Sequence, residues 1–215
     1  MPAPSLGALC GLVLFPNSAA GVWLYGASKL WLLALPVVWL HYVERAPFSL
    51  SPARRGGFVA GVLSGLAIAG VIVAGYLILG DSLIDRSFLR DRLTAVGLGV
   101  PSRYVGAAAY WILVNSVLEE YVWRWFCVRQ CEQVFSRAMA AVCSALFFTI
   151  HHVVAMQVYL GPAPVAICAL GVFSGGAIWS LMYIRYRSIW PGYVSHALVD
   201  VCVFGIGASI LFGAR

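Results

Sequence analysis

Long runs without a charged residue constrain this chain more than any other feature. Residues 56–80 contain no Asp, Glu, Lys or Arg, and comparable apolar runs recur along all 215 residues. Hydrophobic residues make up 62% of the sequence and charged residues only 10%, whereas a soluble domain has about 25% charged residues. Too few polar side chains are present to cover a surface in water. The sequence therefore excludes a soluble globular domain and a disordered chain, and it predicts folding in lipid.

A transmembrane helix needs about 20 mainly apolar residues. Interruptions by charges and by Pro/Gly pairs leave six predicted spans, at residues 19–41, 57–80, 104–130, 138–160, 163–184 and 189–213. The apolar residues 5–15 are too few to cross, and we interpret them as a half-helix or an interfacial segment. No internal repeat is visible. The expected fold is all-α, a polytopic transmembrane helix bundle with about six spans that forms a single domain over residues 1–215.

Glycines recur at helical spacing in two of these spans. Gly57, Gly61 and Gly65 follow one another at intervals of four in the second span, and Gly171 and Gly175 do so in the fifth. Small residues at this spacing let helix backbones approach closely. We expect both stripes to be helix-packing surfaces.

The 14 basic residues are scattered among short connections instead of forming a patch, so nucleic acid is not an expected partner. Arginines follow the first, third and fifth predicted spans, at positions 45, 54, 55, 129, 137, 185 and 187. These connections alternate onto one side, which the positive-inside rule assigns to the cytoplasm. The segment 81–103, whose arginines are partly balanced by aspartates, is an exception on the other side. We expect a multi-pass protein of a prokaryotic cell membrane.

Three acids and three histidines lie within the predicted spans and cannot be assigned to connections. They are Glu119, Glu120, His151, His152, His196 and Asp200. A carboxylate at the bilayer centre costs at least about 2.5 kcal/mol, so such residues mark interior, functional positions. We expect them to converge on a watered cavity between the third, fourth and sixth spans.

The spacing of these residues supports convergence. Glu120 and Arg124 are four residues apart, so they share a helix face and can pair, as can His196 and Asp200. The pair Glu120–Arg124 also has a purely structural interpretation as a stabilising buried ion pair. Adjacent His151 and His152 point about 100° apart on a helix, so only one is expected to face the cavity.

Three sequence motifs resemble those of the CAAX protease and bacteriocin-processing (CPBP, Abi) family of intramembrane glutamic endopeptidases. Glu119-Glu120-Tyr-Val-Trp-Arg124 resembles its EExxxR motif, and the segment from His196 to Asp200 resembles its HxxxN/D motif. The FxxxH motif fits both Phe147/His151 and Phe148/His152. We favour His152, because the family often has a serine four residues before the phenylalanine, as Ser144 precedes Phe148. The resemblance covers about residues 115–200.

The resemblance implies a peptidase that acts in a cavity between helices without a cofactor. By analogy, Glu119 is the general base for a water, and His152 holds and polarises that water. His196 and Asp200 would stabilise the oxyanion, while the supporting residues would be Glu120, Arg124, Phe148 and His151. The sequence differs from the family's motifs at two positions. Trp125 stands where a glycine often follows the family's arginine, and Asp200 stands where the family commonly has asparagine. An ionised aspartate cannot donate to an oxyanion.

The sequence is also compatible with other functions. A metallopeptidase is a runner-up, although the HExxH signature is absent and Cys127 and Cys131 lack the partners of a zinc site. A proton-coupled transporter or a non-enzymatic immunity or scaffold protein would belong to other classes, but we find no pair of inverted repeats. The expected partners are the bilayer and a membrane-associated peptide or protein substrate, whose identity and prenylation the sequence does not indicate.

Overall fold

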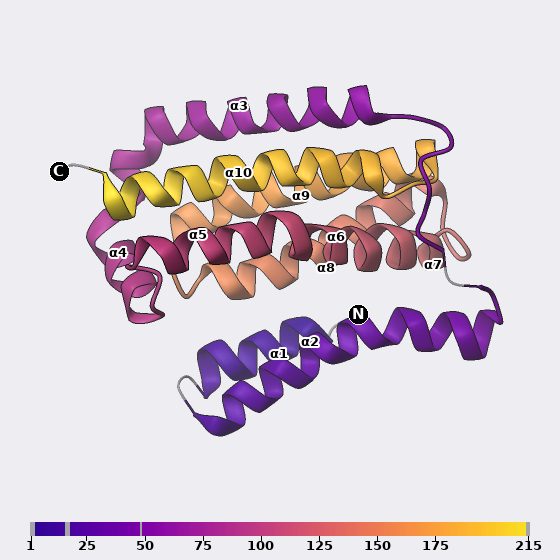
Figure 1. Cartoon of the computed structure of the whole chain (residues 1–215), viewed down its shortest axis with the longest axis horizontal. Coiled ribbons are helices and arrows are strands. Elements are labelled where there is room, and N and C mark those ends of the chain that lie inside the picture. Colours follow the sequence, from indigo (N-terminus) through magenta and orange to yellow (C-terminus); the bar gives the residue numbers. More distant parts are fainter. Residues whose placement is uncertain (1–2, 16–17, 48, 214–215) are drawn as a thin grey trace.

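The structure, a computed structural model, describes residues 3–15, 18–47 and 49–213, and all regular elements in these ranges are helices. At the N-terminal end, α1 (Ala3–Ala8) continues into the π-helical segment η1 (Leu9–Leu14). Together they form a short apolar helix that packs antiparallel on α2 (Ala19–Trp39) (Figure 1). This helix is the predicted N-terminal half-helix.

The remaining elements form an all-helical bundle, as the sequence predicts. The π-helical segment η2 (Leu40–Glu44) extends α2, and α3 (Phe58–Leu83) runs back along the bundle to the short α4 (Arg86–Ala95). A continuous helical run over residues 101–131 follows, and it leads to α8 (Arg137–Met156), α9 (Pro162–Tyr186) and α10 (Trp190–Phe212). In Figure 1, α10 lies between α3 and the other helices.

Five helices are long and apolar enough to cross a membrane: α2 with η2, α3, α8, α9 and α10. They correspond to five of the six predicted spans, so the protein is an integral membrane protein. The predicted span 104–130 lies in the helical run 101–131, which includes Glu119, Glu120 and Arg124. At about 1.5 Å per residue, this run also has the length to cross a hydrocarbon core of about 30 Å.

Local sequence signals explain where these helices begin and end. Ser18 and Ser136 are N-caps whose hydroxyls accept hydrogen bonds from the backbone N–H groups of Gly21 and Met139. Prolines occupy the first turns of three later helices, where a missing N–H costs nothing. Arg187 ends α9 in the left-handed conformation, which stops the helix and turns the chain toward α10.

The glycine stripe of α3 packs against α10, as predicted. A Cβ on Gly61 would lie 2.4 Å from the carbonyl oxygen of Pro191, and one on Gly65 would lie 3.0 Å from the Cα of Ser195. The expectation for Gly171 is wrong, because a Cβ there would have no atom within 4 Å. The close contact of α9 with α8 lies instead five residues further on, at Gly176, where a Cβ would lie 3.4 Å from the Cα of Ala145.

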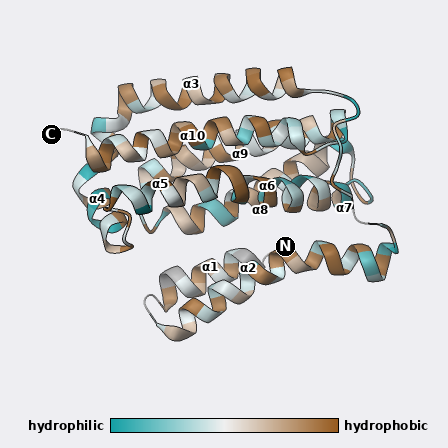
Figure 2. Cartoon of the chain, in the orientation of Figure 1, coloured by the Kyte–Doolittle hydropathy of each residue, from teal (hydrophilic) through white to brown (hydrophobic). Residues whose placement is uncertain are grey.

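The bundle is apolar outside and carries its polar groups within. Along α3, the described buried residues are only glycines, and its exposed side chains are mostly apolar (Figure 2). The buried residues include six serines as well as Glu119, Glu120, Arg124, His151 and His196. The arginine-bearing connections meet at one end of the bundle, where Arg129 pairs with Glu44 and Arg187 pairs with Glu132. This arrangement agrees with the predicted alternation of the connections.

Candidate functional site

The two adjacent glutamates lie on a helix whose winding changes around them. The run 101–131 consists of α5 (Pro101–Tyr110), η3 (Trp111–Asn115), α6 (Ser116–Glu120), η4 (Tyr121–Val128) and α7 (Arg129–Cys131). The one-turn helix α6 therefore sits between two π-helical segments, a form that is rare and frequent at functional sites. Glu119 and Glu120 are both buried, Glu120 completely.

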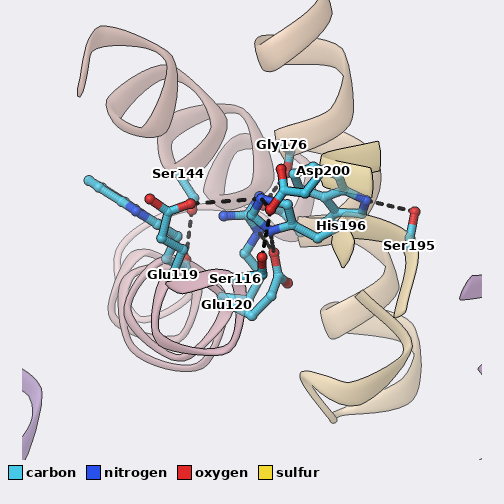
Figure 3. A network of polar contacts seen from close by, with 12 residues as sticks. Ser116, Glu119, Glu120, Ser144, Gly176, Ser195, His196 and Asp200 are labelled. Carbon is cyan, nitrogen blue, oxygen red and sulfur yellow. Dashed lines mark hydrogen bonds and ion pairs between the residues drawn. The ribbon is translucent and has the colours of Figure 1, made fainter. Parts of the chain in front are cut away.

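His196 of α10 is the centre of a cluster of carboxylates (Figure 3). Its Nδ1 lies 3.1 Å from Glu120 Oε1, which makes a hydrogen bond from the imidazole to the carboxylate. Its Nε2 lies 3.7 Å from Glu119 Oε2 and 3.8 Å from Asp200 Oδ2. The two glutamates therefore meet His196 although they precede it by 76 and 77 positions in the sequence, and Asp200 joins them from the same helix as His196.

Arg124 lies behind this cluster and is fully buried. Its Nε is 3.5 Å from Glu120 Oε1, and both side chains have no exposed surface. The guanidinium carbon lies over the rings of Phe148, at 4.5 Å from the ring centroid, and Trp179, at 5.2 Å. Its three nitrogens have no hydrogen-bond partner among the described residues. Trp179 in turn stacks on the imidazole of His196 at 4.1 Å. The arginine is thus held by one ion pair and two aromatic faces.

Asp200 is joined to the helix run 101–131 through a serine. The hydroxyl oxygen of Ser116 lies 2.6 Å from Asp200 Oδ2 and 2.8 Å from the carbonyl oxygen of Trp111. A hydroxyl has one proton, so it can donate to only one of these oxygens. Either an ionised Asp200 accepts from Ser116, or a neutral Asp200 donates to Ser116, which donates to Trp111. Both alternatives for residue 200 therefore have a geometric basis.

The two adjacent histidines of α8 have different surroundings. His152 Nδ1 lies 2.9 Å from the carbonyl oxygen of Phe148, which can only accept, so Nδ1 carries a proton and, in the neutral imidazole, the lone pair is on Nε2. Its ring packs 4.2 Å from that of Phe148, whose other contacts include His196 at 6.0 Å. Among the described residues, His152 makes no hydrogen bond to a carboxylate. His151 instead contacts Lys29.

Lys29 is a member of this region that the sequence analysis did not single out. It lies half-buried in α2, and its ammonium is 3.2 Å from His151 Nε2 and 5.5 Å from the ring centroid of Tyr25. An ammonium only donates, so Nε2 of His151 accepts from it. The signal for this residue was present in the sequence, because Lys29 is the single lysine of the chain and interrupts an apolar span.

Two small or unusual residues fit around the cluster. A Cβ on Gly192 would lie 2.5 Å from Glu120 Oε2, so only glycine leaves room for this carboxylate beside α10. Trp125, which stands where the family often has glycine, is buried and stacks on Tyr121 at 4.6 Å. Its larger ring is therefore accommodated by local packing. Among the described residues, no group of three or more His, Cys, Asp and Glu side chains is arranged to hold a metal ion.

Comparison with known proteins bears on the segment that includes these motifs. Residues 101–202 match a family model described as Type II CAAX prenyl endopeptidase Rce1-like. No match was found among curated proteins or among solved structures. The matched residues include Glu119, Glu120, Arg124, His152 and His196, on the helix run 101–131 and on α8 and α10. The resemblance inferred from the three motifs is confirmed, because residues 101–202 of this chain are similar to the Rce1-like type II CAAX prenyl endopeptidases.

Proposed function

We propose that the protein is an intramembrane endopeptidase that uses water activated by Glu119 to hydrolyse a peptide bond in a membrane-associated or lipid-anchored substrate. The observation that supports this proposal most is the meeting of Glu119, Glu120 and Asp200 at the imidazole of His196. Carboxylates inside an apolar bundle are costly, so three of them at one histidine indicate a function rather than packing.

The first step of the proposed reaction is the activation of water. Glu119 is buried, but its side chain retains about 10% exposure, so a water can reach it. Glu119 takes one proton from the water, and the Nε2 lone pair of His152 accepts a hydrogen bond from the hydrogen that stays on the oxygen. The resulting hydroxide attacks the carbonyl carbon of the scissile peptide bond.

The second step is the stabilisation of the oxyanion. An imidazolium has N–H donors on both nitrogens. In His196, Nδ1 donates to Glu120. Nε2 lies 3.7 Å from Glu119 Oε2 and 3.8 Å from Asp200 Oδ2, beyond hydrogen-bond distance, so its N–H is free to donate to a new acceptor. A donor aimed at developing charge in a dry site lowers the barrier strongly. Asp200 either orients this imidazolium or, when neutral, donates as well.

The third step is the breakdown of the tetrahedral intermediate. Protonated Glu119 returns its proton to the nitrogen of the leaving amine and the C–N bond breaks, which gives a carboxylic acid and an amine; the acid then passes its proton to the amine, so a carboxylate and an ammonium group are released. Water supplies the atoms of the new termini, so the step balances without a cofactor. Glu120 and Arg124 act through His196 as positioning residues, since both are fully buried and Glu120 holds Nδ1. Phe148 and His151 pack beside His152 and have the same kind of role.

The glutamic mechanism is preferred over a metal-dependent one because of the donor set. In the part of the chain that the structure describes, no group of three or more His, Cys, Asp and Glu side chains is arranged to hold a metal ion, and Nδ1 of His196 is taken by Glu120. A zinc site would need three or four such side chains with their donor atoms about 2 Å from one point. The proposal also includes a prokaryotic cell membrane as the location, which agrees with the arginine-rich connections at one end.

The experiment reconstitutes the purified full chain in lipid nanodiscs and presents peptides that carry a prenyl or a fatty acyl anchor, with unanchored copies for comparison. Mass spectrometry of the products should reveal one new carboxyl terminus in an anchored peptide. Cleavage should persist after removal of metal ions by a chelator. Loss on chelation that stoichiometric zinc reverses would contradict the glutamic mechanism, while proton-driven solute uptake without any cleavage would support a transporter instead.

A further inference from the structure

A polar cavity of about 310 Å³ lies at the arginine-rich end of the bundle. Its polar lining comes from the connection between η2 and α3 and from the end of α9, and consists of Ser49, Ser51, Arg54, Arg55, Tyr183 and Arg187. The aromatic rings of Trp125 and Tyr186 complete its wall. The proposed peptidase chemistry uses none of these residues.

The connection that forms one wall is fixed by hydrogen bonds. Ser51 is buried, and its hydroxyl accepts the backbone N–H of Ile189 at 3.1 Å. The hydroxyl of Ser188 donates to the carbonyl of Ser51 at 2.7 Å, and Trp190 Nε1 donates to the carbonyl of Leu50 at 3.0 Å. These bonds join the connection to the link between α9 and α10. The cavity is therefore bounded by a supported backbone.

Close packing also brings the arginine turn against α9. Gly57 has φ +99°, and a Cβ there would lie 2.7 Å from the ring of Tyr186. Only glycine allows this conformation and this approach. The preceding turn, which carries Arg54 and Arg55, is thereby held beside Tyr186 and Arg187.

The cavity carries positive charge that the protein does not neutralise. Arg187 donates two hydrogen bonds to Glu132, at 2.5 and 2.8 Å, and this contact raises the pKa of Arg187 and keeps it charged. Arg54 and Arg55 are exposed, and no acid in the described part of the chain pairs with either. An anion in the cavity would meet two uncompensated guanidinium groups.

The donor set and its position together indicate the ligand. Guanidinium forks match phosphate oxygens in a bidentate way, and serine and tyrosine hydroxyls supply further donors. The cavity lies where α3 begins and α9 ends, which is the level of lipid headgroups for two membrane-spanning helices. Basic pockets between transmembrane helices bind anionic headgroups in this way. We propose that this cavity binds the phosphate headgroup of an anionic phospholipid.

The test measures lipid binding to the purified full chain in neutral detergent by native mass spectrometry. Phosphatidylglycerol should bind more tightly than phosphatidylcholine with the same acyl chains. Combined Arg54→Gln and Arg55→Gln should weaken phosphatidylglycerol binding about thirtyfold, since each basic residue at an anionic headgroup contributes roughly fivefold. Ser49→Trp, which fills the cavity and leaves the charge unchanged, should weaken binding similarly.

The matched control removes two arginines from the same end but outside the cavity. Arg45 and Arg185 are exposed, and Arg45→Gln with Arg185→Gln should change affinity less than threefold. If the control variant and the cavity variant lost the same affinity for phosphatidylglycerol, the binding would depend on the overall surface charge and not on the cavity, and the proposal would be overturned. Equal binding of the two lipids would overturn it too. Inorganic phosphate, added at the same concentration as the lipid and at matched ionic strength, should not displace the bound lipid. Displacement would mean that the cavity binds free phosphate and not a lipid headgroup.

Discussion

Removal of Arg124 alone should destabilise the fold strongly. Arg124 and Glu120 have no exposed surface, so Arg124→Met would leave Glu120 as a buried carboxylate without its cation. Breaking a buried pair from one side costs about 3–5 kcal/mol. His196 still donates to Glu120 at 3.1 Å, so we expect the lower end of this range, about 3 kcal/mol. For a chain of this length that corresponds to a melting temperature lower by about 6–12 °C.

The measurement is thermal unfolding of the purified variants in one detergent, with cleavage activity recorded in parallel. Combining Glu120→Gln with Arg124→Met removes both charges and should restore most of the stability, because no buried charge is stranded. Arg137→Met is the control, since Arg137 is 75% exposed and its contact with Glu132 is 3.8 Å, so it should cost less than about 1 kcal/mol. An unchanged melting temperature for Arg124→Met, or a double variant as unstable as the single one, would refute the reasoning and favour a direct substrate contact for Arg124.

Three further predictions concern the cluster. Asp200→Asn should keep substantial cleavage activity, whereas Asp200→Ala should lower the cleavage rate about 10²–10³-fold, as for the loss of one oxyanion donor. An Asn variant as slow as the Ala variant would mean that the negative charge of Asp200 is required. His152→Ala should abolish cleavage and His151→Ala should lower it less, because Nε2 of His152 is available to bind a water and Nε2 of His151 accepts from Lys29. The reverse ranking in the same assay would assign the FxxxH motif to His151. Gly192→Ala should lower cleavage without changing insertion, because the added Cβ would lie 2.5 Å from the Glu120 carboxylate; full activity would mean that Glu120 moves freely.

Much of the interior arrangement could be predicted because charges inside lipid are costly. The spacing of Glu120 and Arg124 on one helix face was sufficient to predict their pairing, and the i,i+4 spacing brings Asp200 within 3.8 Å of His196. The glycines of α3 were predictable for a similar reason, since a Cβ at Gly61 would collide with the backbone of α10. In these cases one local rule and one energetic cost determine the result.

Other features depend on tertiary contacts that no local pattern encodes. The contact of Lys29 with His151 joins residues 122 positions apart, and the two π-helical segments change the facing of side chains around α6 in a way that a regular helical period does not indicate. Gly171 shares the spacing of the packing glycines but faces open space, because α8 approaches α9 at Gly176 instead. The spacing of glycines predicts that they share one helix face, but it does not predict which of them a neighbouring helix will contact.

The most direct test of the proposed function is the cleavage rate of the Glu119→Gln variant on a lipid-anchored peptide in nanodiscs. Glutamine keeps the shape of the side chain and its place 3.7 Å from His196, but it cannot take a proton from water. The account predicts a rate at least 10²–10⁴-fold lower, the scale of general-base catalysis, with an unchanged melting temperature and unchanged membrane insertion. Cleavage by this variant at the wild-type rate would contradict the assignment of Glu119 as the base.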